Sequence, residues 1–134
     1  MSNADLRSKQ TITYSHSTLE RAERSLICSP FKLSLLEAMQ NRHVPLGEIA
    51  GNSGVQHGYT QRPLSELATD NALVWLIQVG ALRREVDGQG ITDSFRLTPL
   101  GRQLVEQFQQ KPWRTPSWRD RIIDFVIRWL RLPF

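Results

Sequence analysis

The stretch "SFRLTPLGRQLV", residues 94–105, places the end of a strand, a helix cap and the start of a helix in a fixed order. Phe95 to Leu97 is strand-like. Thr98 can cap the following helix, and Pro99 suits its first position, where the N–H that proline lacks has no helical partner. The apolar residues of this predicted helix share one face: Leu100, Leu104, Val105 and Phe108.

The residues before this stretch complete a β-hairpin. Ala81 to Val86 is strand-like, and Asp87-Gly88 together with Gly90 supplies the residues that tight turns require. The pattern therefore predicts a hairpin followed by a helix, which ends at Lys111-Pro112.

Two helices are predicted near the start of the chain. Segment 17–27 begins at Ser17 and has Glu20 three residues later, the spacing of a capping box. Segment 29–41 begins at Ser29, followed by a proline at the first helical position. Its apolar residues fall on one face: Phe31, Leu35, Leu36 and Met39.

The middle of the chain combines a short helix, a loop and an apolar helix. Segment 45–51 is predicted to be helical and to stop at Gly51. Residues 51–63 have three glycines and no apolar period, so they predict a long loop that is either functional or a tolerated surface insertion. Segment 64–79 predicts a helix with Leu67 on its apolar side and a cap or break at Thr69 and Asp70. From residue 72 onward this segment is apolar on nearly every side, a pattern typical of a helix that is buried or shared between subunits.

Composition predicts a non-catalytic globular protein. The 134 residues are 40% hydrophobic and 22% charged, and they suffice for one domain with its own core. The single Cys28 excludes an internal disulfide, and three scattered histidines indicate no metal site. Catalytic and cofactor motifs are absent, so we expect neither an enzyme nor a cofactor. No signal peptide and no apolar run of membrane-spanning length is present, which predicts a cytoplasmic protein.

The order of helices, the run "VGALRRE" (79–85), the glycine-rich hairpin and "SFRLTPLGRQLV" resemble the winged-helix superfamily over residues 30–110. More narrowly, the chain resembles a family of small cyanobacterial winged-helix proteins. The resemblance implies an α+β, mainly α fold: a winged-helix body with an extra N-terminal helix and a C-terminal amphipathic helix. We divide the chain into a flexible segment, 1–16, the winged-helix domain, 17–110, and a linker with the C-terminal helix, 111–134.

The resemblance also implies a dimeric DNA-binding transcriptional regulator. Its third helix would enter the major groove, and its hairpin, the wing, would touch a neighbouring groove or the phosphates. The corresponding residues here are Arg62, Asn71, Gln78, Arg83 and Arg84. However, the candidate reading helix carries Glu66 and Asp70 and has no Lys or Arg after Arg62, which opposes phosphate contact.

The formal net charge of +4 comes entirely from the C-terminal segment. Residues 1–110 hold 11 Lys and Arg against 11 Asp and Glu, whereas residues 111–134 hold six against two. Three of the four tryptophans are also in this segment. Long-range attraction to polyanions should therefore arise mainly there.

The C-terminal segment predicts an amphipathic helix. Ser117 and Asp120 have capping-box spacing, and Asp124 and Arg128 could pair one turn apart on the polar side. The candidate interaction residues are Trp118, Ile122, Ile123, Val126, Ile127, Trp129 and Leu130. Burying five or six such side chains is worth on the order of 10 kcal/mol before ordering costs, so we expect something to cover them.

Four surfaces could cover the apolar face of this helix: the protein's own body, the same helix of a second copy in a homodimer, an anionic membrane surface, or a groove on another protein. Accordingly, two functions remain. The first is the DNA-binding regulator. The second is a winged-helix interaction module without DNA binding, which docks through its basic C-terminal helix, and through the 51–63 loop with Tyr59 and Gln61, to a partner or membrane surface.

Overall fold

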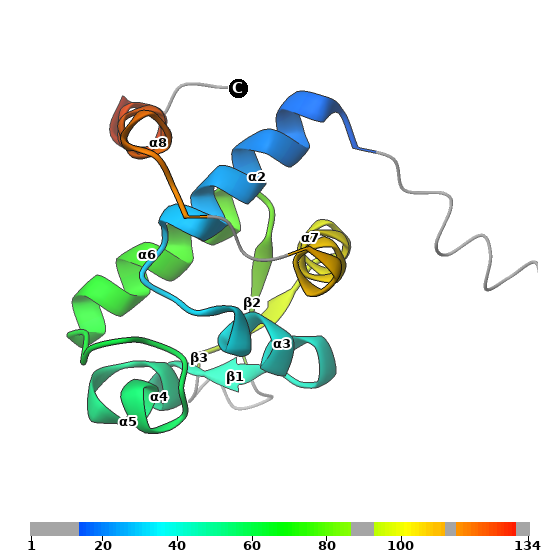
Figure 1. Ribbon diagram of the computed structural model, residues 1–134. Coiled ribbons are helices and arrows are strands. Elements are labelled where there is room, and N and C mark those ends of the chain that lie inside the picture. Colours follow the sequence, from blue (N-terminus) through cyan, green and yellow to red (C-terminus); the bar gives the residue numbers. More distant parts are fainter. Residues whose placement is uncertain (1–13, 87–92, 112–114, 131–134) are drawn as a thin grey trace, which may run out of the picture.

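The computed structural model describes residues 14–86, 93–111 and 115–130. These residues form a mainly helical α+β fold with a small antiparallel sheet (Figure 1), which confirms the predicted fold class. In chain order the elements are α2 His16–Cys28, α3 Leu33–Asn41, β1 Val44–Pro45, α4 Leu46–Ile49, α5 Gly51–Gln56, α6 Glu66–Gln78, β2 Leu82–Val86, β3 Asp93–Leu97, α7 Pro99–Gln110 and α8 Trp118–Leu130.

The predicted hairpin and the helix after it are confirmed. β2 pairs with β3 antiparallel, with Leu82 opposite Leu97 and Arg84 opposite Phe95. The Thr98 side chain accepts a hydrogen bond from the Gly101 N–H and so caps α7. The predicted turn at 87–92 lies outside the described residues. β1 adds to the outer edge of β3, so the sheet order is β1-β3-β2.

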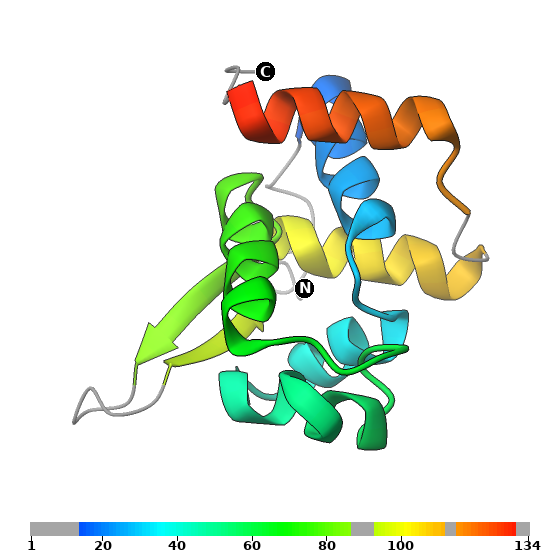
Figure 2. The ribbon, with the colours of Figure 1, turned by 90° about the vertical axis from the view of Figure 1, so that its left-hand side faces the viewer.

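The core lies between the sheet and helices α2, α3, α6 and α7. α3 and α7 pack on each other and on β3, while α6 packs on β2 and on α2. The predicted apolar faces of α3 and α7 are buried here. In both views α8 lies at one end of the molecule and α4 and α5 at the other (Figures 1 and 2). The hairpin points away from α8 (Figure 2).

Both predicted helix starts in the N-terminal part are wrong in detail. α2 is capped by Ser15, whose side chain accepts from the Thr18 N–H, and not by Ser17. Ser29 follows the last residue of α2, and its hydroxyl donates to the carbonyl of Leu26 at 2.6 Å. A serine can serve at either end of a helix because its hydroxyl both donates and accepts. α3 therefore starts later than predicted, at Leu33.

The middle segment contains more helix than the sequence predicted. Gly51 does follow α4, but with its positive φ of 65° it also opens α5, so only part of 51–63 is a loop. α6 is continuous through the predicted break at Thr69 and Asp70. Thr69 is fully buried, and its hydroxyl donates a hydrogen bond to the Ser65 carbonyl within the helix. Leu67, predicted to face inward, is 71% exposed.

None of the described helices is both long and apolar enough to cross a bilayer. Most of the N-terminal segment predicted to be flexible, residues 1–13, lies outside the described residues.

Candidate docking surface on the C-terminal helix

α8 begins with the predicted reciprocal cap. The Ser117 hydroxyl accepts from the Asp120 N–H at 3.1 Å, and the Asp120 carboxylate accepts from the Ser117 N–H at 3.0 Å. Aspartate thus fills the place that glutamate usually has in a capping box. This local bonding explains why a helix restarts here after the break at the end of α7.

The inner face of α8 packs on the body. Ile127 is buried and Ile123 is partly buried against the core, on the side where α8 contacts α2. Between them in sequence, the Asp124 carboxylate accepts hydrogen bonds from Trp75 Nε1 at 3.0 Å and from the Ser25 hydroxyl at 3.1 Å. One oxygen therefore joins α8 to both α6 and α2.

This geometry corrects the predicted polar side of the helix. Asp124 was expected on the solvent side, paired with Arg128, but it faces the body. The Arg128 guanidinium instead lies over the ring of Trp129, 5.8 Å from its centre. Carboxylates that accept from buried donors satisfy those donors, so this arrangement fixes how α8 is rotated about its axis.

The opposite face of α8 exposes a second apolar stripe. Trp118, Ile122, Phe125 and Trp129 are 74%, 51%, 60% and 65% exposed. Their spacing of four, three and four residues keeps them within one narrow strip of a helix. Phe125 and Trp129 also contact each other, with ring centres 5.9 Å apart. We call these four residues the outer stripe.

Two predictions about this helix need correction. The sequence placed Ile122 with Ile123 on a single covered face, whereas the structure turns Ile122 outward. It also omitted Phe125, although the i, i+4, i+7, i+11 repeat from Trp118 would have included it. Val126 is half-buried at the boundary of the two faces, and the Leu130 side chain lies outside the described part of the chain.

The charges around the outer stripe are positive. Helical geometry places Arg119 and Arg128 on its two sides, while the carboxylates of Asp120 and Asp124 bond to the cap and to the body. Among the described residues of α8, the outer half therefore combines large apolar side chains with arginines and carries no carboxylate at its centre.

The residues implied for DNA contact are not gathered into a basic surface. Arg83 pairs with Glu85 at 2.8 Å. Arg84 pairs with Asp93 at 2.6 Å and with Asp70 at 3.2 Å, and it lies over the Phe95 ring. Two carboxylates therefore neutralise Arg84 and join the hairpin to α6.

Asn71 and Gln78 are exposed on α6, and Arg62 is exposed before it. Asn71 and Gln78 line a cavity of about 160 Å³ together with Arg128 and Trp129, so the end of α8 lies beside the candidate reading face. α6 has no Lys or Arg of its own, and at this cavity Arg128 of α8 supplies the positive charge. Within the described residues, no group of three or more His, Cys, Asp or Glu could hold a metal ion.

Fold and surface together define a small α+β protein with a three-stranded sheet, in which the Asp124 carboxylate of α8 bonds to two helices of the body. The model of the Npun_F0494-like family matches residues 12–128, nearly the whole of this arrangement, and the chain belongs to that family. The comparisons with curated proteins and with solved structures give no match.

Proposed function

We propose that the protein is a non-catalytic, cytoplasmic docking module with winged-helix architecture, which attaches to an anionic membrane surface through the outer stripe of α8. The observation that carries the proposal is the orientation of α8: Asp124 holds one face against the body and leaves four large apolar side chains in solvent.

The winged-helix assignment is supported by the chain order. α3, β1, the short helices α4 and α5, α6 and the β2-β3 hairpin follow one another as in that superfamily, and the sheet order β1-β3-β2 agrees with it. Because folds host many functions, this order supports the architecture alone.

A lipid surface fits the outer stripe better than a second copy does. Aromatic side chains present about 150–250 Å² each, so at these exposed fractions the stripe offers roughly 500 Å² of apolar surface, which either occupant could cover. A symmetric pairing of two α8 helices, however, would bring arginines toward arginines. Trp and Phe flanked by arginine are instead the usual composition of a helix that lies on anionic lipid.

Vesicle flotation tests this proposal. The full chain should float with vesicles of phosphatidylcholine containing about 30% phosphatidylglycerol and stay in solution with phosphatidylcholine alone. The double variant Trp118→Ser/Phe125→Ser should reduce the bound fraction at least about tenfold, since each aromatic contributes about 1.5–3 kcal/mol on burial. The matched control is Leu67→Ser, which removes an equally exposed apolar side chain from α6 and should change nothing.

Charge is tested in the same assay. Arg119→Gln/Arg128→Gln should weaken binding, whereas Arg62→Gln/Lys111→Gln, which removes the same charge from the body, should not. If the full chain fails to float, or if Trp118→Ser/Phe125→Ser floats like the parent, the proposal is wrong. It is also wrong if size-exclusion chromatography shows a dimer that the stripe variant alone dissociates, because a second copy then covers the stripe.

A second candidate is the dimeric DNA-binding regulator, and one observation favours it: Arg128 lies beside Asn71 and Gln78. Binding to random duplex DNA should then weaken steeply with salt, and Arg62→Gln and Arg128→Gln should each lower the salt slope by about one. Absence of binding at about 50 mM salt would eliminate this candidate.

A further inference from the structure

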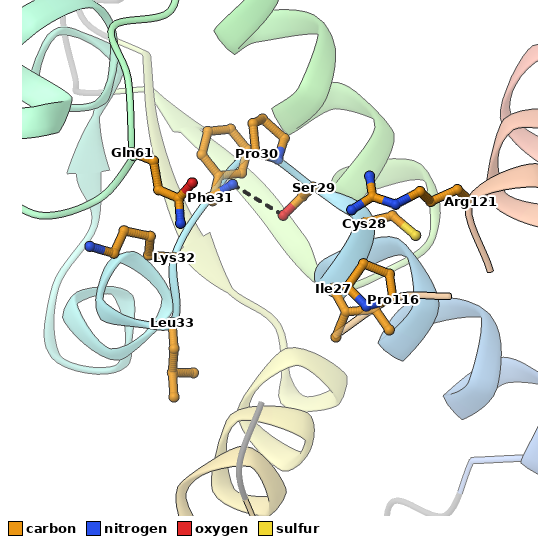
Figure 3. Close-up of a pocket in the computed structure, with 10 residues that line it drawn as sticks. All are labelled: Ile27, Cys28, Ser29, Pro30, Phe31, Lys32, Leu33, Gln61, Pro116 and Arg121. Carbon is orange, nitrogen blue, oxygen red and sulfur yellow. Dashed lines mark hydrogen bonds between the residues drawn. The ribbon is translucent and has the colours of Figure 1, made fainter. Parts of the chain in front are cut away.

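A cavity of about 400 Å³ lies between the end of α2, the connection to α3 and the beginning of α8 (Figure 3). A second cavity, of about 360 Å³, adjoins it and shares several of its residues, among them Cys28, Gln61 and Arg121. Volumes of this size are typical of sites for small molecules. Residues 27–33, Gln61 and the pair Pro116 and Arg121 line the first cavity, and because these three parts are distant in sequence, the fold creates it.

The walls of this double cavity are basic. Arg121 lines both parts, Arg62 lines the second and Lys32 the first, and no carboxylate is among the described residues that line either. Figure 3 shows the Arg121 side chain reaching from α8 toward Cys28 and Ser29. Neighbouring cations in a lining that contains no carboxylate attract an anion.

The Cys28 thiol does not neutralise these cations. Burial first, and then the nearby carboxylates of Asp124 and Asp120, raise its pKa to about 11, so the group is an uncharged thiol near neutral pH. The Ser29 hydroxyl is also occupied, because it donates to the Leu26 carbonyl. The groups left to meet an anion are the Lys32 ammonium group in the first part, the guanidinium groups of Arg62 and Arg121, which both line the second part, and the Gln61 amide.

The rest of the lining is apolar. In the first part of the cavity it consists of Ile27, Pro30, Phe31, Leu33 and Pro116. A ligand that fits both kinds of wall has a charged oxyanion group for the arginines and a compact apolar body for the remainder.

We propose that this cavity binds a small organic anion, with its phosphate or carboxylate group between Arg121 and Arg62 and its apolar body against the end of α2 and the connection to α3. Guanidinium groups suit this task because their planar array of donors matches both oxyanions. Since Arg121 belongs to α8 and Arg62 to the connection before α6, the bound anion links α8 to the body at the end opposite to Ile127.

Cys28 reports on the cavity directly because it is the only cysteine of the chain and lines both parts. The full-length protein is alkylated with iodoacetamide at about pH 9, where a measurable fraction of a thiol with a raised pKa is ionised. We expect phenyl phosphate at millimolar concentration to slow the reaction several-fold. Inorganic phosphate, which lacks the apolar body, should protect less, and phenol, which lacks the charge, should not protect.

Arg121→Gln and Arg62→Gln should each abolish this protection. The matched control is Arg119→Gln, two residues away on α8 and absent from the cavity lining, which should keep it. Circular dichroism verifies that each variant is folded, and the shift in melting temperature with phenyl phosphate gives a second reading that does not depend on the thiol. The proposal is overturned if phenyl phosphate neither protects Cys28 nor raises the melting temperature, or if Arg119→Gln and Arg121→Gln lose protection equally.

Discussion

The Asp124 carboxylate accepts hydrogen bonds from Trp75 and Ser25, one residue on each of the two helices beneath α8. Its position could not be predicted from the sequence, because the partners are 49 and 99 residues away and no local pattern links them. Arg128, four residues after Asp124, indicated an ion pair on the solvent side of the helix instead. These two hydrogen bonds, together with the burial of Ile123 and Ile127, leave the outer stripe of α8 on the solvent side.

Replacing this carboxylate should loosen α8. Asp124→Ala leaves the Trp75 N–H and the Ser25 hydroxyl without their acceptor, so we expect a loss of about 1–3 kcal/mol in the free energy of unfolding. Asp124→Asn keeps one carbonyl oxygen and should cost clearly less. Urea denaturation measures both, and equal stabilities of the parent and Asp124→Ala would contradict the role given to this residue.

The Cys28 thiol should make stability depend on pH in the alkaline range. Its pKa is raised from 9.0 to about 11 in the folded chain, so the folded state holds the proton more tightly than the unfolded state does. The resulting stabilisation is complete below pH 9 and is lost as the pH rises toward 11. Cys28→Ala should therefore lose less stability than the parent over this interval in parallel urea titrations. A parent and variant with the same pH dependence would contradict the shift.

At the scale of the elements, the sequence predicted best where several local signals agreed. Thr98, Pro99 and the apolar repeat after them all indicate one helix start, and the structure confirms it. Ser29 gave a single ambiguous signal, and it bonds to the helix before it rather than the one after it. For α8 the cap at Ser117 was predictable, but two apolar faces on one helix leave the direction of packing to tertiary contacts.

The junction between the sheet and α7 depends on a glycine. A Cβ at Gly101 would lie 2.2 Å from the Ala81 carbonyl oxygen, so Gly101→Ala forces the helix away from β2. We expect a loss of about 1–3 kcal/mol, the usual cost of overpacking. Gly47→Ala, in α4, is the control: nothing lies within 4 Å of its new Cβ, and it should be neutral or slightly stabilising. Comparable melting temperatures for the two variants would show that this close approach is unimportant.

At the scale of the whole molecule, the arginines of α8, its exposed aromatic side chains and its contact with the body lie together at one end. The hairpin and the short helices α4 and α5 lie away from that end (Figure 2). Attachment through α8 would therefore leave them directed toward solvent. The sequence predicted that contact would occur at the C-terminal segment, but it did not predict that the same helix both packs on the body and presents a second apolar surface.

Tryptophan fluorescence with anionic vesicles that carry brominated acyl chains tests membrane docking most directly, because bromine quenches only indole rings that enter the lipid. We expect strong quenching of Trp113→Phe, which keeps both stripe tryptophans, and only weak quenching of Trp113→Phe/Trp118→Phe/Trp129→Phe, which should still bind but has Trp75, shielded in the body, as its one remaining tryptophan. Vesicle-bound protein whose fluorescence is not quenched, or is quenched equally in that variant, would contradict attachment through the outer stripe.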